Sequence, residues 1–128
     1  MKKKKKVSTP KSDPASWRTT EKALTQSLNE DLNEAWQKIR SYSLSLGDQR
    51  IYASGKSIMF SKKTCFFFVR PKKSYLEVVI FLAESKKLES FKSVVAVSKT
   101  KYAHTFKLLH ADQVEGELTD AINKAFSV

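Results

Sequence analysis

The sequence predicts a two-layer α+β domain, with an N-terminal amphipathic helix, an antiparallel β-meander of four to five strands and a C-terminal helix packed on the same sheet face. Three observations lead to this class. Apolar residues recur at steps of three and four over residues 28–46, as in an amphipathic helix. Over residues 50–82 apolar residues recur at every second position, as in strands, and over residues 114–126 they return to the helical spacing.

The first long helix is expected to start near Ser27 and to end at Gly47. Ser27 and Glu30 have the spacing of a capping box, and glycine is the residue most often found just after a helix. Asp13 and Pro14 predict an earlier, shorter helical segment, because Asp suits the N-cap and Pro suits the first helical position.

Four strand candidates follow, and the short polar segments between them are typical of antiparallel hairpins. They comprise residues 50–54, 57–61, 65–70 and 75–82. In the fourth, the even-numbered residues are apolar, whereas Tyr75, Glu77, Val79 and Phe81 form a mixed face. One side of the sheet is therefore expected to face the core and the other to be only partly covered.

The remaining segments give weaker patterns. Residues 84–93 suggest a short helical turn around Leu88 and Phe91, and residues 94–104 suggest a loop or extended passage. Residues 105–110 predict a last strand, with Phe106 and Leu108 facing inward. The closing helix is expected to have Asp112 as its N-cap.

With 128 residues, the chain has room for one domain and one core. Residues 1–15 contain six lysines, two prolines and no aromatic residue, and they predict a disordered basic tail. Residues 16–128 then form a single α+β domain. The only cysteine, Cys65, excludes a disulfide within the chain and a cysteine-based zinc site.

No membrane insertion is expected. No apolar stretch follows the N-terminal lysines, as a signal peptide would require. The longest apolar run, residues 78–83, is far shorter than the roughly 20 residues of a membrane helix. We therefore expect a soluble, cytoplasmic protein.

The positive charge is unevenly distributed. The formal net charge is +11, and residues 50–107 alone contain thirteen Lys and Arg against three acids, whereas residues 12–49 and 108–128 are mildly acidic. A basic sheet would attract polyanions. The alternative is that the lysines keep the sheet soluble and prevent edge-to-edge pairing.

Four blocks of sequence carry a resemblance to a known family: "LSLGDQRIY", "FFFVRPKKSYLEVVIFL", "VSKTKYAHTFKL" and "AINKAF". Together they resemble the family of domains of unknown function numbered 5655, some of whose members are labelled predicted transport proteins. The resemblance covers residues 28–126. It implies an accessory module, because similar domains occur alone or beside nuclease-like domains.

Candidate chemical groups are few. His104 has Ser98, Thr100 and Thr105 nearby in sequence but no acid between Glu89 and Asp112, so a local structural hydrogen bond is favoured over general-base catalysis. Cys65, among phenylalanines, is expected to pack rather than to react. Two histidines six residues apart do not match a metal-ligand cluster. We expect no enzyme activity, cofactor or metal.

Two binding hypotheses remain. The first is a protein contact, including self-association, through the mixed sheet face with Val79 and Phe81. The second is binding of nucleic acid or another polyanion, with Tyr75 or Phe66 stacking on bases. Its candidate residues are Arg70, Lys72, Lys73, Lys99, Lys101, His104 and Lys107.

Overall fold

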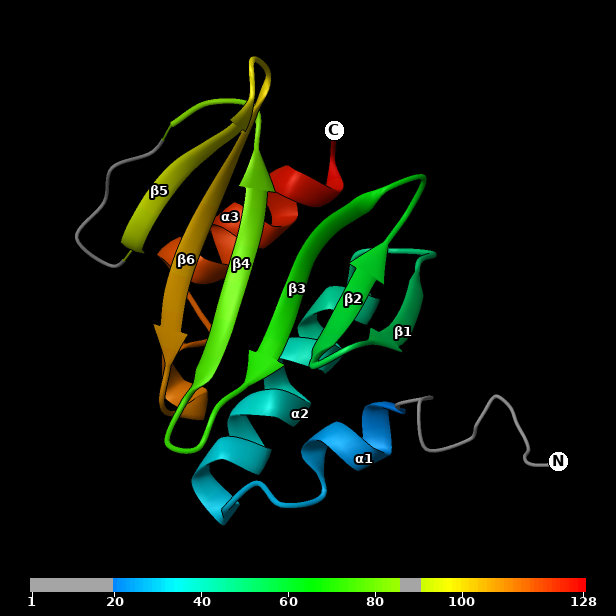
Figure 1. Ribbon diagram of the computed structural model, residues 1–128, viewed down its shortest axis with the longest axis vertical. Coiled ribbons are helices and arrows are strands. Elements are labelled where there is room, and N and C mark those ends of the chain that lie inside the picture. Colours follow the sequence, from blue (N-terminus) through cyan, green and yellow to red (C-terminus); the bar gives the residue numbers. More distant parts are fainter. Residues whose placement is uncertain (1–19, 86–90) are drawn as a thin grey trace, which may run out of the picture.

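The computed structural model describes residues 20–85 and 91–128, and within them it confirms the α+β class (Figure 1). Six antiparallel strands form one sheet in the order β1-β2-β3-β4-β6-β5, one strand more than the upper expectation. The elements are α1 (Glu21–Thr25), α2 (Glu30–Ser45), β1 (Arg50–Ser54), β2 (Ser57–Ser61), β3 (Cys65–Pro71), β4 (Leu76–Leu82), β5 (Phe91–Ser98), β6 (Lys101–Leu108), the 3-10 turn η2 (Ala111–Gln113) and α3 (Glu117–Phe126).

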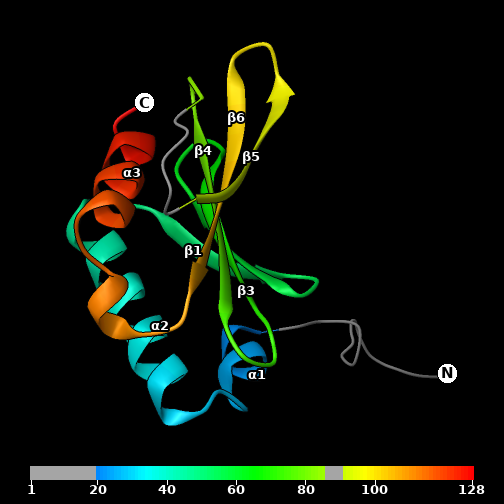
Figure 2. The ribbon, with the colours of Figure 1, turned by 90° about the vertical axis from the view of Figure 1, so that its left-hand side faces the viewer.

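The core lies between the sheet and a layer formed by α2 and α3, which cover the same sheet face (Figure 2). The apolar residues of α2 at steps of three and four, among them Trp36 and Ile39, are buried. In α3, Leu118 and Ile122 are buried in the same way. The sheet contributes Phe60 and Phe67, whose rings stack with centroids 4.2 Å apart. The expected packing of the C-terminal helix is therefore confirmed.

A local irregularity in β3 explains two consecutive buried phenylalanines. Phe67 lies opposite Phe60 and Cys65 lies opposite Ser61, so Phe66 is an extra residue on its strand. Such a bulge breaks the strict alternation of side chains. Phe66 is consequently only 6% exposed, and its ring lies against those of Phe67 and Phe126.

The N-terminus of α2 is capped by Asn29 rather than by the expected Ser27. The Asn29 side-chain oxygen accepts a hydrogen bond from Leu32 N at 2.9 Å, while Ser27 lies in the connection between α1 and α2. Asn and Ser both cap well, but Ser27 lies in the turn that follows α1, where Leu28 N donates to the carbonyl oxygen of Thr25.

Replacing Asn29 with Ala is expected to lower the free energy of unfolding by about 1 kcal/mol, because the cap of α2 is lost. Urea unfolding followed by circular dichroism measures this change. Asn29→Asp retains the acceptor and serves as the control. If Asn29→Ala leaves stability unchanged, Asn29 is not the N-cap.

Gly47 follows α2, as expected, and has a specific reason to be glycine. Its φ is +145°, and a Cβ atom at this position would lie 3.0 Å from Cζ of Phe126 in α3. The end of α2 thus approaches the end of α3 closely, and only a residue without a side chain allows this.

The largest differences from expectation lie between β4 and β6. Phe91 begins the edge strand β5, in place of a helical turn, and the passage over residues 94–104 is part of a β5–β6 hairpin. Most of β5 is exposed, so it lacks the alternation of apolar and polar residues by which a strand is recognised. Leu88 lies outside the described residues.

The last helix also begins later than expected. Asp112 lies in η2, where Oε1 of Gln113 accepts from the backbone N–H groups of Leu109 and His110. The chain then turns at Gly116, with φ +56°, before α3. As expected, Phe106 and Leu108 of β6 face the core.

The tail predicted for residues 1–15 and the helix start at Asp13 lie outside the described residues. Among the residues that the structure does describe, no helix is long and apolar enough to cross a membrane.

Candidate functional site

The sheet face opposite α2 and α3 is the main candidate surface. Figure 2 shows these two helices on one side of the sheet, with none of the described helices over β4, β6 and β5 on the other side. We call this side the open face. The strand registers place on it Arg50, Tyr52, Met59, Phe68, Arg70, Glu77, Val79, Phe81, Lys101, Ala103, Thr105 and Lys107. Tyr75, in the β3–β4 turn, and Lys92, in β5, join this face because the Tyr75 ring contacts both Lys107 and Lys92.

Aromatic rings and cations are paired across the open face. Lys107 Nζ lies 4.8 Å from the ring centroid of Tyr75, and Lys92 Nζ lies 5.8 Å from the same ring. Lys101 Nζ lies 5.1 Å from the ring centroid of Phe81. These distances are within the range of cation–π attraction, which holds each ammonium group over a ring without neutralising it.

Two arginines extend the pattern toward β1. Arg70 Cζ lies 5.8 Å from the ring centroid of Phe68, and its Nε donates to Ser57 Oγ at 3.0 Å. Arg50 Cζ lies 5.3 Å from the ring of Tyr52, which is 39% exposed. Four rings on one uncovered face therefore each carry at least one cation.

The charge of the open face is strongly positive. Among the residues that the structure describes, five cationic side chains, Arg50, Arg70, Lys92, Lys101 and Lys107, share it with one carboxylate, that of Glu77. The register places Glu77 between Arg70 on β3 and Lys107 on β6. Such a face attracts anions over several ångströms and loses this attraction as salt increases.

The structure brings together only part of the residue set predicted from sequence. Arg70, Lys101 and Lys107 lie on the open face, with Tyr75 among them. Lys72 and Lys73 lie in the β3–β4 turn, and Lys99 lies in the β5–β6 turn at the other end of the sheet (Figure 1). These three lysines flank the open face without forming its centre.

His104 lies on the core side of β6 and is fully buried. Its Nδ1 is 3.1 Å from the carbonyl oxygen of Tyr102, and its ring meets that of Phe91 edge-on at 5.2 Å. It therefore makes the local backbone contact expected from sequence. Because its side chain points away from the open face, we leave His104 out of the candidate surface. Phe66 is left out for the same reason.

Sequence reasoning missed several members of the open face. The alternation in β1 contained the signal for Arg50 and Tyr52, since every second residue of a strand lies on one side. Phe68 could not be assigned in this way, because the bulge at Phe66 breaks the alternation in β3. Lys92 could not be placed, because its segment was expected to be helical.

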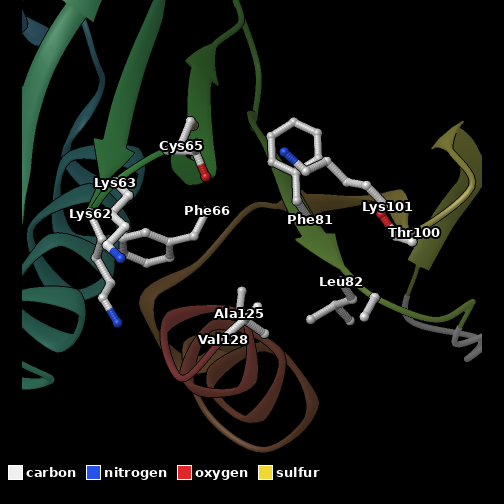
Figure 3. A pocket seen from close by; sticks show the side chains of 12 residues that line it. Lys62, Lys63, Cys65, Phe66, Phe81, Leu82, Thr100, Lys101, Ala125 and Val128 are labelled. Atoms are coloured by element: carbon white, nitrogen blue, oxygen red, sulfur yellow. The ribbon is translucent and has the colours of Figure 1, made fainter.

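A pocket of about 360 Å³ lies at one end of the sheet, beside the C-terminus of α3 (Figure 3). The pairing of β3 with β4 ends at Phe67 and Ile80, so Cys65 and Phe66 on one strand are separated from Phe81 and Leu82 on the other. The residues around the opening are Lys62, Lys63, Thr64, Cys65, Phe66, Phe81, Leu82, Ala83, Thr100, Lys101, Ala125 and Val128.

The thiol of Cys65 lies in this pocket and donates to the carbonyl oxygen of Phe67 at 3.2 Å. Burial raises the pKa of Cys65 above the usual value of a thiol, and its hydrogen bonds to Phe60, Ser61 and Phe67, with the charge of Lys101, only partly oppose this. The thiol therefore stays protonated at neutral pH, when it is a poor nucleophile.

The rate of Cys65 alkylation by iodoacetamide is accordingly expected to rise with pH around a midpoint above that of a free cysteine, for which the pKa is about 8.5. Because the chain has one cysteine, mass spectrometry follows this reaction at a single site. Glutathione under the same conditions is the reference. A midpoint below that of glutathione would contradict the conclusion that burial is the main influence on the pKa of Cys65.

Within the described residues, no group of three or more His, Cys, Asp or Glu side chains is arranged to hold a metal ion. Most of the charged side chains on the open face and around the pocket are Lys and Arg, which bind anions by charge and hydrogen bonding.

Comparison with known proteins gives the family. A search of curated proteins and a search of solved structures each found no match. The family model described as Domain of unknown function (DUF5655) matches residues 21–128, which include every helix and strand described above. The chain belongs to the DUF5655 family.

Proposed function

We propose that the domain is a non-enzymatic module that binds single-stranded nucleic acid on its open face. The observation that supports this best is the pairing of rings and cations on one uncovered sheet surface. Proteins that bind single strands combine these two elements, because bases stack on aromatic rings while Lys and Arg hold the phosphates.

The shape of the surface favours a single strand over a duplex. Phe68 and Phe81 in the sheet and Tyr75 in the β3–β4 turn are half-buried, so they present ring surface to a ligand lying on the sheet. Bases in a duplex are stacked on each other and cannot reach such rings. The rings therefore add affinity only for a strand with unpaired bases.

The kinds of side chains present favour a role in binding rather than catalysis. Among the described residues, the open face has one carboxylate, and the histidine nearest to it, His104, is buried on the other side. General acid–base catalysis needs a titratable group within hydrogen-bonding reach of the reacting atoms. Lysines paired with rings supply charge and position instead.

Fluorescence anisotropy with a labelled oligonucleotide tests this proposal. The same sequence is offered as a single strand and as a duplex at equal salt, and heparin is used as a competitor that has charge but no bases. We expect tighter binding to the single strand, which heparin displaces weakly. Equal affinity for both forms, with ready displacement by heparin, would show that the open face binds polyanions in general and does not select single strands.

A protein contact is the second candidate function, and β5 is the part of the sheet that favours it. β5 is an edge strand, and its Val95 and Val97 are 58% and 57% exposed. Exposed apolar side chains on an edge strand favour pairing with another chain. The centre of the mixed face offers less exposed apolar surface, because Val79 is only 8% exposed.

Sedimentation of the protein at low and at high salt tests the second candidate. Pairing through β5 predicts a doubled mass that persists in high salt and is lost in Val95→Lys. A monomer under both conditions would exclude self-association through this edge.

A further inference from the structure

The pocket between β3 and β4 adjoins the open face. Phe81 and Lys101 belong to both, because Phe81 lies on β4 just beyond the last β3–β4 pair and Lys101 lies over its ring. Figure 3 shows Cys65 and Phe66 across the opening from Phe81 and Lys101. A strand lying along the open face can therefore continue into the pocket.

Three lysines contribute to the wall of the pocket: Lys62, Lys63 and Lys101. The described residues that line it include no Asp or Glu. Lys62 is held in place, since its Nζ donates to the carbonyl oxygen of Phe126 at 2.5 Å and lies 4.2 Å from the Phe126 ring centroid. An ammonium group has three donors, so Lys62 keeps donors for an anion.

The wall also has apolar side chains, among them Phe66, Phe81 and Leu82. A pocket that joins cations to aromatic and aliphatic surface fits a ligand with an anionic group and a flat apolar part. Its volume of about 360 Å³ is near the lower end of the range for small-ligand sites, about 300–1,000 Å³. The pocket thus has room for one small group rather than for a passing chain.

We propose that this pocket receives the terminal nucleotide of the bound strand and selects a strand that ends in a phosphate monoester. The three lysines hold the phosphate, and the terminal base packs against Phe81. A terminal monoester carries a charge of about −1.5 to −2 at pH 7, more than the single charge of an internal phosphodiester. A pocket wall with three lysines therefore favours the end over the interior of a strand. This inference rests on the proposed function.

The single thiol provides a reporter inside the pocket. Oligonucleotides of one sequence, with a 5′-phosphate, a 3′-phosphate or neither, are first shown by anisotropy to saturate the protein. Alkylation of Cys65 by iodoacetamide is then measured with each bound. We expect one phosphorylated strand to bind at least several-fold more tightly than the unphosphorylated strand and to slow alkylation further at saturation.

Lys63→Gln is the matched variant, because Lys63 lines the pocket, whereas Lys62 also donates to the carbonyl oxygen of Phe126 in α3. It should abolish the preference for the phosphorylated strand and leave binding of the unphosphorylated strand nearly unchanged. Lys56→Gln, in the β1–β2 turn, makes the same charge change away from the pocket and should preserve the preference.

The outcomes separate the two proposals. If strands bind the open face but the terminal phosphate changes neither affinity nor Cys65 alkylation, the pocket inference is overturned and the proposed function stands. If no strand binds, both fail. Protection of Cys65 by a nucleoside monophosphate without strand binding would likewise overturn the strand-end assignment, because the pocket would then serve a free nucleotide.

Discussion

Tyr75→Ala is expected to weaken binding of a single-stranded oligonucleotide by roughly 5- to 150-fold, which corresponds to about 1–3 kcal/mol for one stacked base. Tyr75 is the ring most strongly surrounded by charge, with Lys92 and Lys107 both within 6 Å of its centroid. Its removal takes away the stacking surface and also the ring that positions two cations. Anisotropy at fixed salt measures the change.

Tyr75→Phe is the control for this prediction. It keeps the ring and its attraction for Lys92 and Lys107, and it removes only the hydroxyl group. Affinity within a few-fold of that of the unmodified protein is expected. Equal losses in Tyr75→Phe and Tyr75→Ala would show that the hydroxyl, and not stacking, is responsible. No loss in either would remove Tyr75 from the site.

Phe67→Ala is expected to lower the free energy of unfolding by about 3–5 kcal/mol. Phe67 is fully buried, stacks on Phe60 at 4.2 Å and lies 5.2 Å from Phe66. The loss combines removal of apolar surface with the cavity left in a packed aromatic cluster. Urea unfolding measures it. Phe67→Leu, which fills more of the space, should lose clearly less and remain folded.

For Phe68, the residue after Phe67, we expect a smaller loss of stability and a larger loss of binding. Phe68 faces the open side, where its ring lies 6.0 Å from that of Phe81 and beneath Arg70. Phe68→Ala should therefore cost less stability than Phe67→Ala and should weaken nucleic-acid binding. If the two substitutions had equal effects on stability and neither affected binding, the division of the sheet into core and open faces would be wrong.

The fold class could be predicted because its signals are local. The helical spacing of Leu32, Trp36 and Ile39 and the alternation in β4 both reflect burial of one side of an element. Each is visible in a window of a few residues. For the same reason the mixed face of β4, with Tyr75 and Phe81, was recognised from the sequence as partly uncovered.

The edge strand could not be predicted from such signals. β5 buries Phe91 but leaves most of its residues exposed, and its place in the sheet depends on pairing with β6. The bulge at Phe66 could not be predicted from the sequence for a different reason. Phe66, Phe67 and Phe68 are chemically identical, and only the register with β2 decides which of them face the core.

The candidate site was predicted in composition but not in arrangement. Lys101 and Lys107 were identified from charge, whereas the placement of Lys101 over Phe81 depends on the pairing of β4 with β6. His104 lies between them in sequence, yet it faces the core because its neighbours in the strand face the other way. The pocket, formed by residues from three separate strands and α3, had no signal in the sequence.

The central claim is that the open face binds nucleic acid, and the salt dependence of oligonucleotide binding tests it most directly. The triple variant Lys92→Gln, Lys101→Gln, Lys107→Gln removes three cations from the open face. The control triple variant Lys22→Gln, Lys38→Gln, Lys56→Gln removes three exposed cations from α1, α2 and the β1–β2 turn. Both variants retain the N-terminal lysines, so a difference between them reports the folded domain.

For a single strand, the slope of log K against log salt concentration is about −0.7 for each phosphate contact. Loss of three contacts should therefore reduce the magnitude of the slope by about 2 in the open-face variant and leave it nearly unchanged in the control. Equal slopes for the two triple variants would contradict the claim and assign any binding to charge outside the open face.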